Sequence, residues 1–198
     1  FFDYRIEGTV TGRLSCGAYN AQKDGKSFPL GLSFHTLPRE REDSIRGVCI
    51  SPPEHYFITA DFKAMELRIL AHVAGVKNMI KAFFSGQDLH KYTASLIYEK
   101  DIKDVTKEER QIAKSVSFLI VYGGGAWKLS KTANISLAVA EATIERFKQV
   151  YPEVFTWMEK VKNQIYDQEY VTSIFGRRRN LPDIKSPIQK IQDKCIRQ

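Results

Sequence analysis

Residues 110–125 read RQIAKSVSFLIVYGGG and have the spacing of a two-sided helix followed by three glycines. Four side chains recur at every fourth position, so they lie along one side of a helix. They are Arg110, Lys114, Phe118 and Tyr122. The opposite side is an apolar packing stripe of the kind that faces a core. It consists of Ile112, Val116, Leu119 and Ile120.

Both ends of this helix are marked in the sequence. Thr106 is a candidate N-cap, and Glu109 three residues later completes a capping box. The glycines at 123–125 lack the side chains that would continue the helix. We therefore expect a helix that begins near Thr106 and ends near Tyr122.

The polar side of this helix carries two cations one turn apart and then two aromatic rings. Two adjacent cations suit a polyphosphate, and a ring beyond them suits a sugar or base. The stretch therefore predicts a helix that holds a nucleoside triphosphate. A solvated basic face with its rings packed sideways explains this stretch alone equally well, because basic amphipathic helices are common.

The composition is that of a globular, basic protein. Hydrophobic residues make up 43% of the 198 residues, and the formal net charge is +7. This charge favours an anionic partner, nucleic acid before membrane, because no stretch is long and apolar enough to span a bilayer. The three scattered cysteines, Cys16, Cys49 and Cys195, indicate a reducing compartment, so we expect a cytoplasmic protein.

The first third of the chain alternates between short strands and loops. Residues 1–14 have strand-like alternation, and 15–47 form a long loop-rich segment. Residues 56–60, YFITA, are an apolar run typical of a strand, which places Asp61 at a strand end. A helix is predicted over 63–74 with one apolar side. That side consists of Met65, Ile69, Leu70 and Val73.

A second candidate phosphate site lies upstream of the central helix. Asp88 is a candidate N-cap for a helix that runs through Tyr98. His90 then lies in the first turn, where backbone donors and the positive end of the helix dipole favour phosphate. A lone histidine at such a position is more often an ordinary surface residue.

Two further helices are predicted after the central one. Ser136 begins the first, and Pro152 separates it from a second that ends near Gln168. Six residues of this pair have core spacing. They are Phe147, Val150, Val154, Trp157, Val161 and Ile165.

The last segment combines a strand, a basic cluster and a helix. Residues 170–175 predict a strand, and Gly176 turns into Arg177–Arg179. Three adjacent arginines are either a solvated patch or a contact with a phosphate backbone. Ser186 begins a final helix, with Cys195 on its apolar side.

Several motifs together resemble the family A DNA polymerases. DFKAMELR at 61–68 is similar to the first catalytic motif of that family, and residues 110–123 are similar to its finger helix, with Arg, Lys, Phe and Tyr-Gly at the family spacing. Shorter matches fall in family order around them. They are TGRL at 11–14, IR at 45–46, DLH at 88–90, YPEV at 151–154 and GRRR at 176–179. The resemblance covers essentially the whole chain.

The resemblance implies a role for each residue at the centre of these motifs. Asp61 would bind the catalytic metals, two Mg²⁺ ions in the complete enzyme, with Mn²⁺ as a possible substitute. Arg110, Lys114 and His90 would grip the triphosphate of the incoming dNTP. Lys114 would also donate a proton to the leaving pyrophosphate.

Other residues are implied to recognise the sugar, the base and the DNA. Phe118 would pack against sugar and base, Tyr122 would close over the nascent pair beside the template, and Glu66 would block a ribose 2′-hydroxyl. The residues implied to contact DNA are Arg13, His35, Arg46, Tyr122, Arg177, Arg178 and Arg197. His35 enters because SFHTLP at 33–38 resembles the family's Asn-Leu-Gln-Asn-Ile-Pro.

The chain departs from the family pattern at four places. Lys63-Ala64 replace a usual Ser-Gln, Leu119 replaces a small residue, and 16–32 resembles an insertion. The sequence also contains no His-Asp pair, whereas the family's second catalytic carboxylate lies in a His-Asp-Glu hairpin. We therefore expect these residues to be a fragment or one half of a split polymerase. Alone they would not extend primers without a complementing polypeptide or the remainder of the chain.

The implied fold class is α/β, a partial polymerase palm sheet with a mainly α-helical fingers subdomain. Palm is expected at 1–86, fingers at 87–166 and a return to palm at 167–198. The resemblance implies a bacterial or phage-infected host cell, with primer–template DNA as the partner. Two other functions stay open: a non-catalytic primer–template binding module, and a single-subunit RNA polymerase, which Glu66 disfavours.

Overall fold

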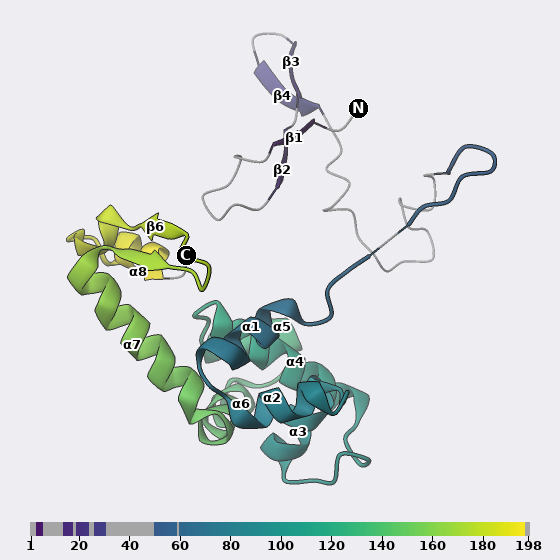
Figure 1. Cartoon of the computed structure of the whole chain (residues 1–198), viewed down its shortest axis with the longest axis vertical. Coiled ribbons are helices and arrows are strands. Elements are labelled where there is room, and N and C mark those ends of the chain that lie inside the picture. Colours follow the sequence, from purple (N-terminus) through teal and green to yellow (C-terminus); the bar gives the residue numbers. More distant parts are fainter. Residues whose placement is uncertain are drawn as a thin grey trace. The chain divides into compact units, whose positions relative to one another are not determined.

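The computed structural model describes residues 3–5, 14–17, 19–23, 26–30, 50–58 and 60–196. The chain divides into two compact units, Phe1–Asp61 and Phe62–Gln198. The positions of these units relative to one another are not determined, so each is described by itself (Figure 1). Four residues predicted to contact DNA lie outside the described residues. They are Arg13, His35, Arg46 and Arg197.

The first unit contains two antiparallel hairpins. Strand β1 (Asp3–Arg5) pairs with β2 (Ser15–Gly17), and β3 (Tyr19–Lys23) pairs with β4 (Lys26–Leu30). The segment predicted to be loop-rich, 15–47, therefore contains short strands that the sequence analysis did not identify. The missed signal is the dipeptide Asp24-Gly25 between β3 and β4, because Asp-Gly between two strands is a strong predictor of a hairpin.

The predicted strand at 56–60 is absent from the described residues of that segment. Tyr56, Phe57 and Ile58 have no strand conformation, and their side chains are 90%, 64% and 93% exposed. A strand exists only when its backbone groups bond to a neighbouring strand. None of the three described two-stranded sheets includes this segment, so its apolar composition alone did not produce a strand.

The second unit is built mainly from helices that share one core (Figure 1). Five of its fully buried side chains come from five different helices. They are Leu67, Met79, Val116, Leu129 and Phe147. The helices are α1 (Met65–Val73), α2 (Lys77–Phe84), α3 (Leu89–Tyr98), α4 (Lys107–Val121), α5 (Ala126–Ala133), α6 (Leu137–Val150) and α7 (Pro152–Gln168). The predictions missed α2 and α5, each of which has eight residues.

Helix α1 begins two residues later than predicted and buries only part of the predicted side. Ala64 has a left-handed φ of 50°, so the helix begins at Met65 rather than Lys63. Met65 and Ile69, predicted to face the core, are 47% and 45% exposed. The buried side consists of Leu67, Leu70 and Ala71. Leu70 belongs to both sets, and Val73 is half-buried, so the predicted side is buried only in part. Periodicity alone did not fix how far the buried side extends around the helix.

Helix α7 leads from the shared core to a second, smaller cluster of elements (Figure 1). Strand β5 (Tyr170–Thr172) pairs antiparallel with β6 (Arg178–Asn180), followed by the 3-10 helix η3 (Pro182–Lys185) and α8 (Gln189–Ile196). The predicted strand is confirmed for its first three residues. Two of the three clustered arginines lie in a strand rather than in a turn. The cluster's buried residues are Ile165, Leu181, Ile184 and Cys195.

The predicted fold class is confirmed: a mainly helical body accompanied by short strands. None of the helices in the described part of the chain is long and apolar enough to cross a membrane. The boundaries proposed for palm and fingers stay a prediction.

Candidate functional site

Helix α4 has both of its predicted terminal signals. The Thr106 hydroxyl accepts a hydrogen bond from the Glu109 amide at 3.1 Å, and the Thr106 amide donates to the Glu109 carboxylate at 3.0 Å. At the other end the Gly123 amide donates to the Ile120 carbonyl, and Gly123 has a φ of 64° that favours glycine. The capping box and the glycine stop are therefore confirmed.

The predicted apolar side of α4 packs into the core. Val116, Leu119 and Ile120 are buried, and Ile112 is half-buried. The opposite side carries the residues predicted to hold a nucleotide. The surroundings of these residues differ from one another.

Arg110 is held by the residue that caps the neighbouring helix. One oxygen of the Asp88 carboxylate, Oδ2, accepts hydrogen bonds from Arg110 Nε at 2.9 Å and Nη2 at 2.7 Å. The other oxygen, Oδ1, accepts from the amides of His90 at 3.0 Å and Lys91 at 3.1 Å. Asp88 is thus the predicted N-cap of α3 and also the ion-pair partner of Arg110. Burial by itself would raise the pKa of Asp88, but these hydrogen bonds outweigh it and lower the pKa below its usual value.

His90 lies in the first turn of α3, beside Asp88 and Arg110, and is electrically neutral near pH 7. Burial lowers the pKa of His90 to about 4, because the charged ring loses hydration, and the charges of Arg110 and Lys114 act in the same direction against the opposing effect of Asp88. The ring contacts Phe118 of α4, with centroids 5.9 Å apart and planes inclined by 43°. Its Nδ1 is buried and has no hydrogen-bond partner among the described residues.

Lys114 is exposed one turn after Arg110, and its charge is close enough to disfavour protonation of His90. Arg110, Lys114 and His90 therefore form one local group on the α3–α4 side of the second unit. Phe118 borders this group as a half-buried ring. A polyanion at this place would meet two cations and one neutral imidazole.

Glu66 and Tyr122 form a link between two helices. The Tyr122 hydroxyl donates a hydrogen bond to Glu66 Oε1 at 2.7 Å, which joins α1 to the C-terminal end of α4. Tyr122 is 43% exposed. Both residues were predicted to lie at the sugar and base of the nucleotide, and they are adjacent in the structure although 56 positions separate them in the chain.

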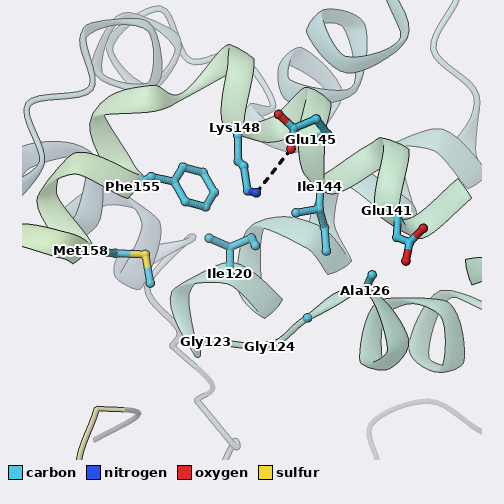
Figure 2. A pocket seen from close by; sticks show the side chains of 11 residues that line it. Ile120, Gly123, Gly124, Ala126, Glu141, Ile144, Glu145, Lys148, Phe155 and Met158 are labelled. Carbon is cyan, nitrogen blue, oxygen red and sulfur yellow. Dashed lines mark hydrogen bonds and ion pairs between the residues drawn. The ribbon is translucent and has the colours of Figure 1, made fainter. Parts of the chain in front are cut away.

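A cavity of about 460 Å³ opens beside the glycine turn (Figure 2). Its lining includes Ile120, Phe155, Met158 and the glycines at 123–125. An ion pair between Lys148 and Glu145, 3.3 Å apart, also lines it. Since none of Arg110, Lys114 and His90 lines this cavity, it is not the predicted triphosphate site.

The family model described as DNA polymerase family A matches residues 2–198. The chain belongs to the family A DNA polymerases. It is 36% identical over 183 residues to DNA polymerase I of Rhizobium leguminosarum, covering 92% of this chain and 17% of that protein. It is 34% identical over 189 residues to the thermostable DNA polymerase I of Thermus filiformis. This match covers 96% of this chain and 21% of that protein. The chain thus spans about a fifth of the length of these relatives.

A solved structure of a family A polymerase is similar in fold. It is described as the POL domain of Pol1 from M. smegmatis in complex with DNA primer-template and dNTP. The TM-score is 0.80 at 26% sequence identity, and the match covers 99% of this chain and 33% of that one. This similarity confirms the predicted family and fold class.

Asp61, the predicted metal ligand, closes the first unit and is exposed. Lys114 belongs to the second unit, so the prediction that both line one cavity stays a prediction. In the part of the chain that the structure describes, no cluster of three or more His, Cys, Asp or Glu residues could hold a metal ion. Mg²⁺ commonly takes one or two protein carboxylates together with phosphates and waters, so one exposed carboxylate fits a shared site and not a closed protein cage.

The basic cluster after β5 also presents two exposed side chains. Arg177 and Arg178 are exposed, and the Arg178 guanidinium carbon lies 3.7 Å from the centre of the Tyr170 ring, which is a cation–π contact. Arg178 Nε also donates to Asn180 Oδ1 at 2.9 Å. Contact of these arginines with DNA stays a prediction.

The predictions missed two features that shape the site. The first is the pairing of Asp88 with Arg110, because a carboxylate at an N-cap gives no sequence signal of a second partner 22 residues away. The second is the fit of Leu119 against Gly124. A Cβ added at Gly124 would overlap the Leu119 side chain, so Leu119 would have to shift if residue 124 were not glycine. The departure from the family pattern at Leu119 is thus accompanied by a glycine at 124.

Proposed function

We propose that this chain supplies the dNTP-binding group and the first metal carboxylate of an enzyme that transfers a nucleotide from a dNTP to a primer 3′-hydroxyl on a DNA template. The observation that carries the proposal is the grouping of Arg110, Lys114 and His90 on the α3–α4 side, bordered by Phe118. A triphosphate is the ligand that uses all of them. Membership of the family A polymerases and the dNTP in the similar structure support this assignment.

The three polar residues would act on different parts of the triphosphate. Arg110 and Lys114 would neutralise negative charge that grows on the pyrophosphate as the α-phosphorus is attacked in line. His90, neutral at pH 7 by virtue of its lowered pKa, would donate one N–H to a phosphate oxygen without adding charge. Lys114, whose side chain is exposed, would transfer a proton to the departing pyrophosphate.

The exposed carboxylate of Asp61 would hold the metal that accompanies the triphosphate. Bound Mg²⁺, with Mn²⁺ as a substitute, would stabilise the entering and leaving oxygens of the displacement. The sequence contains no His-Asp pair, so we propose that the second carboxylate of the site comes from outside residues 1–198. It would belong either to a complementing polypeptide or to further residues of the same chain.

The link between Glu66 and Tyr122 would select deoxynucleotides. The hydrogen bond fixes the Glu66 side chain beside the end of α4, where it would occupy the space of a ribose 2′-hydroxyl. A single-subunit RNA polymerase needs that space empty, which makes it the weaker alternative. In the completed enzyme, Glu66→Ala should raise ribonucleotide incorporation, and an unchanged ratio would remove the assignment.

Primer–template DNA is the proposed macromolecular partner. The net charge of +7 and the exposed Arg177 and Arg178 provide cations for a phosphate backbone. We also propose that the DNA contacts Arg13, His35, Arg46 and Arg197. A cytoplasmic location is a separate part of the proposal.

Equilibrium binding of a dNTP with Mg²⁺ tests the proposal on the purified chain. Lys114→Ala should weaken binding about tenfold or more, as expected for loss of a charge-assisted contact. Lys160→Ala is the matched control, because it removes an exposed lysine of the same charge from α7. Equal affinities for the two variants would overturn the proposal.

A module that binds only primer–template remains the second candidate, because the basic charge alone would support it. It predicts binding of DNA but no saturable dNTP binding, with or without Mg²⁺. Primer extension separates the two further. The 198-residue chain should not extend a primer by itself, and it should do so when a polypeptide with the second carboxylate is added.

A further inference from the structure

We propose that Asp88 is a positioning residue that fixes Arg110 and the first turn of α3 in one arrangement ready for the triphosphate. The inference rests on the function proposed above and assigns a role to a residue that contacts no part of the nucleotide. Its basis is the way in which one carboxylate divides its two oxygens between two helices.

Each oxygen of the Asp88 carboxylate has a separate task. Oδ1 accepts from the amides of His90 and Lys91 and thereby holds the first turn of α3. Oδ2 accepts from Nε and Nη2 of Arg110 and thereby holds a side chain of α4. The bonds run from 2.7 to 3.1 Å, within the range of well-formed hydrogen bonds. Arg110 and the backbone that carries His90 are therefore fixed to the same rigid group.

This arrangement leaves Arg110 able to bind an anion. A guanidinium has five N–H groups in a planar fork, and Asp88 takes one from Nε and one from Nη2. Three N–H groups remain, including both on Nη1. Arg110 is half-buried, with its side chain 38% exposed, so these donors are accessible to a ligand. A long side chain that is already held loses less conformational entropy when it binds.

Asp88 could also weaken nucleotide binding, and the experiment must distinguish this effect from positioning of Arg110. Its negative charge reduces the attraction between Arg110 and a triphosphate, and a carboxylate can compete with phosphate for the same guanidinium. Competition would make removal of the Asp88 charge improve nucleotide binding. Positioning predicts the reverse, because an unheld Arg110 would sample rotamers that point away from the site.

Asp88→Asn is the decisive variant. Asparagine is as good an N-cap as aspartate, so α3 should keep its first turn. Its single carbonyl oxygen would remain with the amides of His90 and Lys91, and its NH₂ group would face the donors of Arg110. The ion pair is then lost while the cap is retained. Asp88→Ser is a second variant of the same kind, because serine caps helices but is too short to reach Arg110.

We expect Asp88→Asn to raise the Kd of a dNTP about tenfold, the size associated with a lost charge-assisted contact. Binding of the corresponding deoxynucleoside, which has no phosphates, should not change. In the Arg110→Ala background, Asp88→Asn should cause no further loss, because Asp88 would have no guanidinium left to hold. Circular dichroism confirms that each variant retains its helices.

Each other result overturns the inference. If Asp88→Asn and Asp88→Ser bind the dNTP as the unchanged chain does while Arg110→Ala binds weakly, Asp88 is only a helix cap and the proposed function still stands. If both variants bind the dNTP more tightly, Asp88 competes with the ligand. If the unchanged chain shows no dNTP binding, the proposed function fails and this inference fails with it.

Discussion

The α3–α4 pair and the segment at 50–58 show why two apolar stretches of one chain can end in opposite states. Helix α4 buries Val116 completely, whereas Tyr56 and Ile58 are 90% and 93% exposed. A helix satisfies its backbone hydrogen bonds within itself and needs only a surface on which to pack. A strand needs a neighbouring strand before its backbone is satisfied. Apolar composition therefore predicts burial reliably only when the element that carries it can form locally.

The largest expected effect comes from truncating the same side chain in the two regions. Phe147→Ala removes a ring that is 1% exposed in the shared core and should lower the free energy of unfolding by about 3–5 kcal/mol. Phe57→Ala removes a ring that is 64% exposed and should change it by about 0.5 kcal/mol or less. Urea unfolding followed by helical circular dichroism measures both.

The contrast between the two regions would be wrong if Phe57→Ala lowered the free energy of unfolding as much as Phe147→Ala does. That result would mean that the segment at 50–58 is packed in solution, and that its exposed apolar side chains have a partner.

The same contrast explains which elements the sequence could predict. Thr106 and Ser136 mark helix starts through hydrogen bonds made within a few residues, and Pro152 marks one through its own fixed φ. All three predicted boundaries are confirmed. The extent of the buried side of α1 depends on residues distant in the chain, and it was predicted only in part. Strand formation at 56–60 depends on a distant partner in the same way, and the predicted strand there was wrong. In the candidate site, the residues of α4 and His90 were recognisable from spacing and family motifs. The Asp88–Arg110 pair was not, because it depends on how two helices pack.

A second prediction concerns the turn that ends α4. Gly124→Ala would place a Cβ 2.2 Å from Leu119 Cδ1 and should lower the free energy of unfolding by about 1–3 kcal/mol, the usual cost of overpacking. Leu119→Ala should also destabilise, through the cavity it leaves. The double variant should be less destabilised than the sum of the two, because the added methyl enters the vacated space.

Additive effects of Gly124→Ala and Leu119→Ala would contradict the steric pairing of these residues. The control is Gly125→Ala, where an added Cβ meets nothing within 4 Å. It should cost clearly less than Gly124→Ala in the same urea titration.

The helix cap gives a smaller effect. Thr106→Ala removes the hydroxyl that accepts from the Glu109 amide and should lower the free energy of unfolding by about 1 kcal/mol. Ser51→Ala removes a hydroxyl of similar type that donates to the His55 carbonyl at 2.7 Å in the exposed segment. It should change the free energy by less than about 0.5 kcal/mol, because no helix depends on that bond. Equal losses of unfolding free energy in Thr106→Ala and Ser51→Ala would show that local hydrogen bonds stabilise the segment at 50–58 as much as they stabilise α4.

Replacing His90 should have the smallest effect on the free energy of unfolding near neutral pH. Its effect at lower pH tests how tightly α3 and α4 pack against each other. Burial lowers the pKa of His90 from 6.5 to about 4, with Arg110 and Lys114 adding to this and Asp88 opposing it. Between these two pH values the unfolded chain binds the proton and the folded chain does not, so folding is weakened as the pH falls from 6.5 towards 4. His90→Gln should remove that part of the pH dependence while leaving the stability at pH 7 to 8 less affected. If the slope of unfolding free energy against pH is the same in His90→Gln as in the unchanged chain, the ring is hydrated in solution, and the α3–α4 pair is more open there than its buried Nδ1 indicates.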